Sequence, residues 1–222
     1  MDDLDNELIG YIRELMPIKD EKLSDYQKLC YDLKIPVIRL ETARFITVLL
    51  QIRKPENVLE IGTASGFSAS VIEKCLSDTG RIVTIEKSPA LADRAAEYFR
   101  ELGISKRIEI IRQDALGAVK GLDAGSFDVI FLDAAKGQYI NLFQDCLRLL
   151  KVGGLLIADD VFQRGDIWKE ISDIERRQRT VHRRLREFLE AATTNPSLES
   201  CILPLGDGLL LSIKTAEVAN EG

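Results

Sequence analysis

VLEIGTASGFS, residues 58–68, is the stretch that decides the fold of this chain. It opens with a short apolar run, continues through a turn that contains Gly62 and Gly66, and ends where a helical pattern begins. Glycine allows the backbone to approach a ligand closely, and the free N–H groups at a helix N-terminus attract polar or anionic groups. The stretch therefore predicts a strand, a ligand-binding turn and a helix in immediate succession.

The same rhythm repeats along the rest of the chain. Short runs rich in Val, Ile and Leu alternate with amphipathic stretches of helical period, which is typical of a parallel sheet buried on both faces. The predicted strands are residues 58–61, 81–86, 107–112, 127–133 and 154–159, and the predicted helices between them are residues 67–77, 89–102, 115–120 and 138–150. A long amphipathic helix is expected at about 168–192. The final segment CILPLGDGLLLSIK, residues 201–214, predicts two strands joined by a Gly206–Asp207–Gly208 turn.

The first 55 residues contain only helical patterns, separated by Pro17 and Pro36. A chain of 222 residues is long enough for one sizeable core. We therefore expect one domain over residues 1–222, with a helical N-terminal extension, residues 1–55, and an α/β core, residues 56–222.

The composition narrows the class of protein. Hydrophobic residues make up 45% and charged residues 30%, as in ordinary globular proteins. The net charge of −6 gives no general attraction for nucleic acid. We see neither a signal peptide nor an apolar run near the roughly 18 residues that span a bilayer. The four cysteines lack CxxC spacing, which fits reduced thiols. We expect a soluble, cytoplasmic protein without a membrane partner.

Polar residues follow the predicted strands at the edge where open α/β sheets bind ligands. The glycine turn follows the first strand, Glu86 ends the second, and Asp114 follows the third. An acidic side chain about 20 residues beyond the glycines can bind ribose hydroxyls, whereas the lack of GxGxxG and of GK[ST] disfavours pyrophosphate binding. These features favour an adenosine-containing ligand, although a plain tight turn also explains the glycines.

Three carboxylates follow the next two strands. Asp133 ends the fourth strand, and Asp159 and Asp160 end the fifth. Mg²⁺ prefers such oxygen ligands, and without a cation the three groups would repel one another. Lys136 lies three residues after Asp133, where a nearby metal would favour its neutral amine as a general base. The alternatives are that Asp160 caps the next segment and that Lys136 is simply solvated.

The ordered motifs VLEIGTASGFSA, TIEKSP, RQDAL, FDVIFLDAAKGQY, GGLLIADDVFQRG and PLGDGLLLS resemble those of the metal-dependent class I O-methyltransferases. That family contains catechol and caffeoyl-CoA O-methyltransferases, and the resemblance covers nearly the whole chain. It implies a Rossmann-like class I methyltransferase fold, with a seven-stranded mostly parallel sheet and helices on both faces, and a homodimer. Within the family, DAAKGQY, PLGDGL and the arginine-rich stretch most resemble the bacterial tRNA 5-hydroxyuridine methyltransferases.

The resemblance also implies the site residues. Contacts with S-adenosylmethionine (SAM) are expected at Ile38, Glu60, Gly62, Ser68, Glu86, Asp114, Ala115 and Asp133. The expected metal ligands, for Mg²⁺ or Mn²⁺, are Asp133, Asp159 and Asp160, and the expected catalytic residues are Lys136 and Asp133. The family usually has Asn where this chain has Asp160, so the affinity and preference of the site for metals are open.

The sequence leaves the acceptor open. Six arginines and no acidic residue lie between Arg176 and Arg186, and Arg176, Arg179, Arg183 and Arg186 fall on one side of the expected helix. Such a face suits the phosphates of a tRNA, although a solvated or dimer-facing helix is an equal alternative. With the resemblance, we expect Mg²⁺-dependent methylation of the 5-hydroxyl of 5-hydroxyuridine at the tRNA wobble position. The alternatives are a small catechol or phenol as acceptor, and a catalytically silent SAM- or RNA-binding protein.

Aromatic residues near these motifs have two interpretations. They can stack on an acceptor base or ring, or they can belong to the core. The candidates are Phe67, Tyr139, Phe162 and Trp168. His182, the only histidine, has no nucleophile or cysteine near it in sequence and is assigned no catalytic role.

Overall fold

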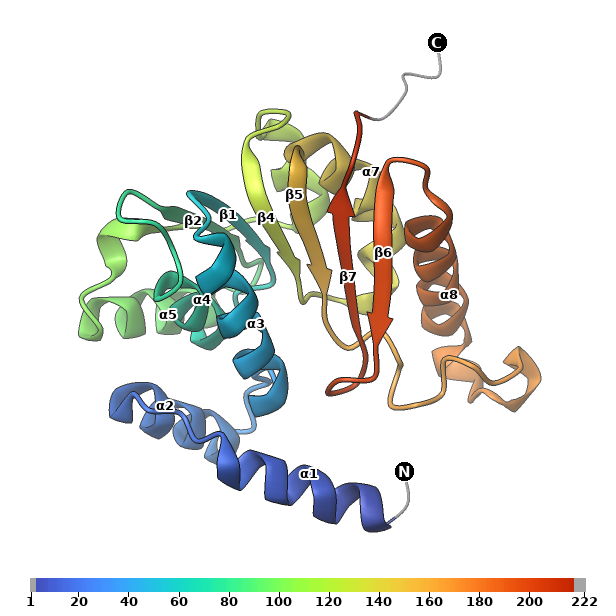
Figure 1. Ribbon diagram of the computed structural model, residues 1–222, viewed down its shortest axis with the longest axis horizontal. Coiled ribbons are helices and arrows are strands. Elements are labelled where there is room, and N and C mark those ends of the chain that lie inside the picture. The colour runs from blue at the N-terminus through green and yellow to red at the C-terminus, as the bar shows by residue number, and fades with distance from the viewer. Residues whose placement is uncertain (1–2, 218–222) are drawn as a thin grey trace.

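One seven-stranded sheet forms the centre of the molecule (Figure 1). The computed structural model describes residues 3–217, so residues 1–2 and 218–222 of the predicted domain lie outside the described part. The strands follow the order β3-β2-β1-β4-β5-β7-β6. The first five pair in parallel, whereas β7 runs antiparallel to both β5 and β6. The strands are β1 (Asn57–Ile61), β2 (Arg81–Ile85), β3 (Ile108–Ile111), β4 (Phe127–Leu132), β5 (Leu150–Ala158), β6 (Leu198–Leu203) and β7 (Leu209–Lys214).

Helices cover both faces of the sheet, as the sequence predicts. Successive side chains of a strand point to opposite faces, so Val58 of β1 lies in one hydrophobic cluster and Leu59 in the other. The first cluster is covered by α2 (Glu21–Asp32), α3 (Leu40–Arg53), α4 (Phe67–Glu73) and α5 (Pro89–Glu101). The second is covered by α6 (Ala115–Ala118), α7 (Tyr139–Leu149) and α8 (Arg179–Thr194). Burial on both faces explains why the strands read as nearly continuous apolar runs.

The N-terminal part is helical, as predicted. α1 (Asp3–Leu15) is joined to α3 by a forked ion pair, in which Arg13 donates from Nε and Nη2 to the two carboxylate oxygens of Glu41 at 2.9 and 2.8 Å. Asp20 caps the N-terminus of α2, where its carboxylate accepts a hydrogen bond from the Leu23 N–H at 3.0 Å. Among residues 3–217, no helix has both the length and the apolar character needed to cross a bilayer.

The prediction of one helix over residues 168–192 is wrong in its first half. α8 begins at Arg179, and the chain between β5 and α8 is irregular, with two short 3₁₀ turns at Ile171–Asp173 and Arg176–Gln178 (Figure 1). Arg179 donates to the carbonyls of Ile174 and Ser172 at 2.9 and 3.0 Å. The Arg179 side chain and local turn bonds, such as that from the Ile167 N–H to the Phe162 carbonyl at 3.0 Å, pair backbone groups of this segment in place of helical hydrogen bonds.

The carboxyl ends of the parallel strands lie in one row. Just beyond the strands, backbone N–H groups still pair with the neighbouring strand, with Asp133 donating to Ile61 at 3.0 Å and Asp159 to Leu132 at 3.1 Å. In the same way, the Glu86 N–H donates to the carbonyl oxygen of Ile111 at 3.0 Å. The residues that follow the strands are therefore brought together at one edge of the sheet, as the topology predicts.

Candidate functional site

The glycine turn after β1 packs directly on the end of β4. Gly62 has φ +107°, and a Cβ atom there would lie 2.1 Å from the carbonyl oxygen of Asp133. Only glycine fits both the positive φ and this close approach. The Glu86 carboxylate then fixes the turn, since it accepts a hydrogen bond from the Ala64 N–H at 3.0 Å and another from the Ser88 N–H at 2.8 Å.

A pocket of about 230 Å³ opens at this edge of the sheet. Asp114 holds one wall by capping α6, where its carboxylate accepts a hydrogen bond from the Leu116 N–H at 3.1 Å. Apolar side chains such as Ile85 and Leu142 contribute to the lining. Of the residues predicted to contact the cofactor, five line the pocket: Gly62, Glu86, Asp114, Ala115 and Asp133.

The other three residues predicted to contact the cofactor do not line this pocket. Ile38, Glu60 and Ser68 are all buried. Glu60 is completely inaccessible, and its carboxylate accepts a hydrogen bond from the Thr84 hydroxyl. Burial raises the pKa of Glu60 to about 8, although the hydroxyls of Ser68 and Thr84 oppose this shift. Glu60 therefore lies behind the pocket wall rather than in it.

Three carboxylates meet at the ends of β4 and β5. Burial, together with the charge of Asp160, raises the pKa of Asp133 to about 6. Burial, together with the charges of Asp133 and Asp160, raises the pKa of Asp159 to about 8. The buried Tyr139 hydroxyl lies 3.2 and 3.1 Å from the carbonyl oxygens of Leu132 and Asp159, so it holds the two strand ends in place. Asp133 and Asp160 therefore lie close enough to Asp159 to raise its pKa.

Lys136 lies at the same edge, on the short 3₁₀ turn Lys136–Gln138 that follows β4. Its Nζ is 2.6 Å from Oδ2 of Asp160, in an ion pair that is about one third exposed. Asp160 has φ +57°, a left-handed conformation that few non-glycine residues adopt. Within the described residues, no group of three or more Asp, Glu, His or Cys side chains is already arranged to hold a metal ion.

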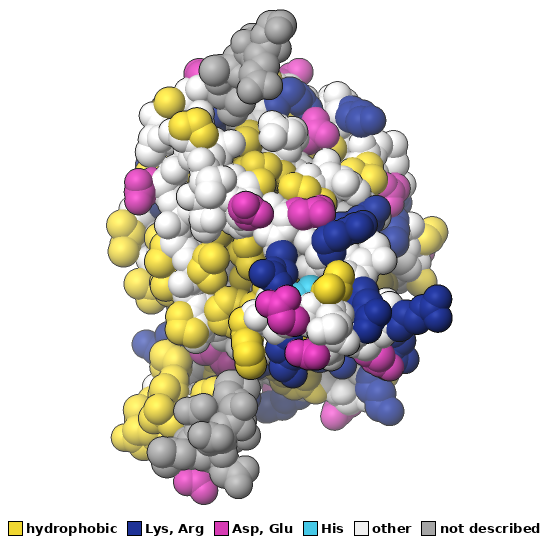
Figure 2. All heavy atoms as spheres, turned by 90° about the vertical axis from the view of Figure 1, so that its right-hand side faces the viewer, with side chains coloured by type: hydrophobic (Ala, Val, Ile, Leu, Met, Phe, Trp, Pro, Cys, Tyr) yellow, Lys and Arg dark blue, Asp and Glu magenta, His cyan; other side chains and the backbone are white. Residues whose placement is uncertain are grey.

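The arginine-rich segment differs from the predicted face of one helix. Arg176 lies in the 3₁₀ turn before α8, and Arg179 is engaged by the carbonyls described above. Arg186 donates to the Lys169 carbonyl at 3.4 Å, and Arg183 pairs with Glu187 at 3.6 Å. All four side chains remain exposed. Lys and Arg side chains gather on one part of this side of the molecule (Figure 2).

The aromatic candidates divide into core and surface. Phe67 and Tyr139 are buried, so the interpretation as core residues is correct for both. Phe162 is half-buried. Its ring packs against Gly208 so closely that a Cβ atom on residue 208 would overlap it. Trp168 is 76% exposed and is the one of these four that presents an open ring.

Comparison with known proteins identifies the family. The sequence model described as O-methyltransferase matches residues 17–215. The chain belongs to the O-methyltransferase family. It is 31% identical to a catechol O-methyltransferase of Niastella koreensis, covering 73% of this chain and 76% of that protein. It is 27% identical to a caffeoyl-CoA O-methyltransferase of Eucalyptus gunnii, covering 92% of this chain and 86% of that one.

The fold agrees with this assignment. An SAH-bound methyltransferase of Podospora anserina superposes with a TM-score of 0.85 at 25% identity, covering 97% of each chain. The present protein is a SAM-dependent O-methyltransferase with the class I methyltransferase fold. In this O-methyltransferase, supporting residues that sequence reasoning missed include Thr84 behind the pocket and Asp207, which accepts a hydrogen bond from the Arg164 N–H at 2.7 Å. The GDG turn was visible in the sequence, but nothing there indicated which segment its aspartate would hold.

Proposed function

We propose that this O-methyltransferase methylates the 5-hydroxyl of 5-hydroxyuridine in tRNA, with a divalent cation bound at the acidic edge. The observation that carries the proposal is the exposed basic segment, residues 176–186, which comes after Asp160 in the chain. Arg176 and Arg183 are exposed, and neither donates to a backbone carbonyl within residues 3–217. The exposed ring of Trp168 offers a stacking surface of the kind that RNA-binding proteins use for unpaired bases.

SAM is proposed to occupy the pocket between the glycine turn and α6. When bound, it supplies the methyl group on its sulfonium. The carboxylate of Glu86 lies at the pocket wall with two of its lone pairs already on backbone N–H groups, which leaves acceptor capacity for ribose hydroxyls. Asp133 lines the pocket on the side of the acidic edge, so the cofactor and acceptor regions meet there.

The residues at the acidic edge fit a hard divalent cation by their chemistry. Asp133 and Asp159 are carboxylates whose pKa values are raised by burial and by their neighbours, and Lys136 is already bound to Asp160. A cation would relieve the repulsion among them, and oxygen is the ligand that Mg²⁺ and Mn²⁺ prefer. Asp133, Asp159 and Asp160 would hold the ion, which supplies Lewis-acid activation of the acceptor hydroxyl.

Lys136 is proposed to move the proton. The Lys136 ammonium first releases a proton to solvent, because only the neutral amine has a lone pair that can accept one. The acceptor hydroxyl then gives its proton to the neutral Nζ, its oxygen forms the new bond to the methyl carbon, and the C–S bond breaks with its electron pair left on sulfur. Because Nζ lies beside Asp160 at 2.6 Å, the same carboxylate stabilises the ammonium that forms. Tyr139 keeps the two strand ends fixed, so the reacting groups need little reorganisation.

A small catechol is the second candidate acceptor. The similarity to the catechol O-methyltransferase of Niastella koreensis favours it. Catechols and 5-hydroxyuridine share the relevant chemistry, which is a hydroxyl group beside a second oxygen that a metal can hold. The acidic edge therefore suits either acceptor, and the surface around it decides between them.

The deciding experiment is a methylation assay with labelled SAM. The acceptors are tRNA isolated from cells that lack 5-hydroxyuridine methylation, and a panel of catechols that includes caffeic acid. We expect label in the tRNA, lost on treatment with EDTA and restored by Mg²⁺ or Mn²⁺. Labelled catechol with unlabelled tRNA would establish the second candidate instead.

A salt titration tests the basic surface separately. If Arg176 and Arg183 contact phosphates, the affinity for tRNA falls with salt by a log–log slope of roughly 0.7–0.9 per contact, and the double variant Arg176→Ala, Arg183→Ala has a smaller slope. The matched control is Arg81→Ala, Arg100→Ala, which removes the same charge from exposed positions near the opposite edge of the sheet. Equal slopes for the two double variants would remove these arginines from RNA binding.

A further inference from the structure

α8 contacts the turn that carries Lys136. Arg184, which is half-buried on α8, donates from Nη1 to the carbonyl oxygen of Gly137 at 3.2 Å. The helix is packed closely here, because a Cβ atom on Gly137 would lie 3.6 Å from Cγ2 of Val181. A guanidinium that donates to a carbonyl makes a charge-assisted bond, stronger than a neutral one. Arg184 therefore fixes the backbone one residue after Lys136.

The same turn of α8 also contacts the segment that follows Asp160. His182 is buried, with Nδ1 2.9 Å from Oε1 of Gln163 and Nε2 3.1 Å from the carbonyl oxygen of Lys169. The segment needs such support, because Asp160, Gln163 and Arg164 all have positive φ, between 52° and 58°. Each residue held in this region costs about 1–3 kcal/mol and persists only when its surroundings hold it.

We infer that Arg184 is a positioning residue for Lys136 and that the 181–184 turn of α8 sets the geometry of the Lys136–Asp160 ion pair. The turn holds one partner through Arg184 and Gly137, and the other through His182 and the segment after Asp160. Lys136 follows β4 and Asp160 follows the neighbouring strand β5, so the sheet brings them to one edge, and the 181–184 turn contacts the chain just after each of them. The inference rests on the proposed role of Lys136 in methyl transfer.

This role separates Arg184 from its arginine neighbours. Arg183, the next residue, has 62% of its side chain exposed, whereas Arg184 is half-buried and directed at the turn after β4. The two adjacent arginines therefore serve different ends. Arg183 belongs to the exposed basic segment, whereas Arg184 binds the backbone of the turn that carries Lys136.

Three variants test the inference by kinetics. Arg184→Met keeps the length and apolar stem of the side chain but removes the donor, whereas Arg184→Lys keeps an N–H donor. The control is Arg100→Met, because Arg100 is an exposed arginine in the last turn of α5, away from the basic segment. With 5-hydroxyuridine-containing tRNA and with caffeic acid as acceptors, we expect Arg184→Met to lower kcat by about 10- to 100-fold, the loss typical of a misplaced reacting group. The KM for SAM should change less than twofold, Arg184→Lys should recover most of kcat, and thermal melting should show that each variant is folded.

A double-mutant cycle distinguishes positioning from a general structural effect. If Arg184 acts through Lys136, the change Arg184→Met has little further effect on kcat in a Lys136→Met background. Equal losses in both backgrounds would overturn the inference. Full activity of the single variant Lys136→Met would instead overturn the proposed function, so the two failures are distinguishable.

A crystal structure of Arg184→Met gives a readout that does not depend on turnover. We expect the separation of Lys136 Nζ and Asp160 Oδ2 to increase from 2.6 Å to beyond about 4 Å, where an ion pair is no longer made. An unchanged separation would overturn the inference even if neither acceptor were methylated.

Discussion

Two aspartates at opposite ends of β4 have opposite electrostatic surroundings. Asp128, at the amino edge of the sheet, accepts hydrogen bonds from the N–H groups of Glu56 and Asn57 and from Lys151 Nζ at 2.8 Å. Burial alone would raise its pKa, but Lys151 and the two amides outweigh burial and lower it. Asp133, at the carboxyl edge, is raised to a pKa of about 6 by burial and by Asp160, and Lys136 offsets only part of this.

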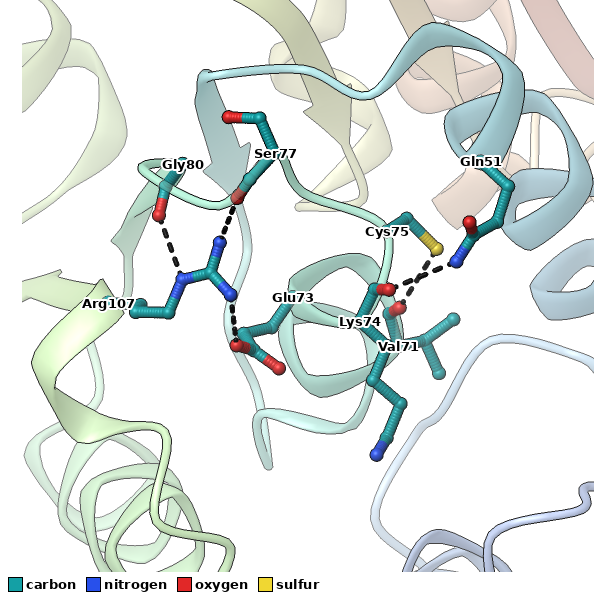
Figure 3. A network of polar contacts seen from close by, with 8 residues as sticks. All are labelled: Gln51, Val71, Glu73, Lys74, Cys75, Ser77, Gly80 and Arg107. Atoms are coloured by element: carbon teal, nitrogen blue, oxygen red, sulfur yellow. Dashed lines mark hydrogen bonds and ion pairs between the residues drawn. The ribbon is translucent and has the colours of Figure 1, made fainter.

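The same contrast holds for the two edges as a whole. At the amino edge, the Arg107 guanidinium donates to Glu73 and to the carbonyls of Gly80 and Ser77, so a charged group is fully used in holding a loop (Figure 3). At the carboxyl edge, Glu60 and Asp159 join Asp133 as carboxyls with raised pKa values. Side chains at the amino edge are paired for stability, whereas the carboxyl edge holds carboxyls whose pKa values are raised by burial and by one another, an arrangement that stability alone does not require. Such clusters of shifted pKa values are typical of functional sites.

The largest expected effect comes from two lysines that form similar ion pairs at the two edges. Lys136→Met should lower kcat by about 10²–10⁴-fold, the usual contribution of a general base, and leave the free energy of unfolding within about 1 kcal/mol of wild type. Lys151→Met should lower the free energy of unfolding by roughly 1 kcal/mol and leave kcat unchanged. Steady-state kinetics and urea denaturation of both variants check this. A loss of activity in Lys151→Met would break the contrast.

A pH effect is expected from Glu60. Its pKa is about 8 in the folded chain, against about 4.3 for an unfolded glutamate. Between these values the folded chain holds a proton that the unfolded chain has lost, so the free energy of unfolding falls by about 1.4 kcal/mol per pH unit as the pH rises. Glu60→Gln should remove this part of the slope between about pH 5 and 8. Urea denaturation at several pH values measures it, and Glu109→Gln, at an exposed position on β3, is the control that should keep the slope.

A smaller effect is expected on cofactor affinity. Glu86→Ala should weaken SAM binding by roughly 1.5–3 kcal/mol, the range for hydrogen bonds to a charged group. Part of this loss reflects the turn itself, because the same carboxylate holds the Ala64 N–H. Isothermal calorimetry on Glu86→Ala and on Glu109→Ala separates a loss at the pocket from a general loss of charge. Unchanged SAM affinity in Glu86→Ala would remove Glu86 from the cofactor site.

The sequence predicts the carboxyl edge well, because that edge follows directly from strand order. Each apolar run became a strand within a few residues of its predicted bounds, and the polar residue after each run came to the same edge. β5 is the largest departure, since it begins at Leu150 rather than residue 154. The metal, the acceptor and the homodimer stay predictions.

The segment between β5 and α8 could not be predicted from sequence. The helical spacing of apolar residues in α8 extends into the residues before Arg176, so the sequence predicts a longer helix. Helix propensity is a weak guide, however, and tertiary contacts override it here. Here Asp207 and His182 hold residues 162–169 from elements that follow in the chain. The burial of Glu60 could not be predicted from sequence either. In a strand that is buried on both faces, the order of apolar and polar residues does not show which polar side chain is inside.

The smallest expected effect is the one that tests the metal directly. If the carboxylates at the carboxyl edge bind Mg²⁺, a concentration ten times the dissociation constant should stabilise the folded enzyme by about 1.4 kcal/mol, because the ion binds the folded state and not the unfolded one. Asp133→Asn should abolish the increase in Tm that Mg²⁺ produces. Asp128→Asn should keep it, although this variant starts from a lower Tm because the pair with Lys151 is weakened. The two changes are chemically identical and lie at the two ends of β4, so only the edge differs. An equal Mg²⁺ response in both variants would place the ion elsewhere. A response lost in Asp128→Asn alone would reverse the assignment of the two edges.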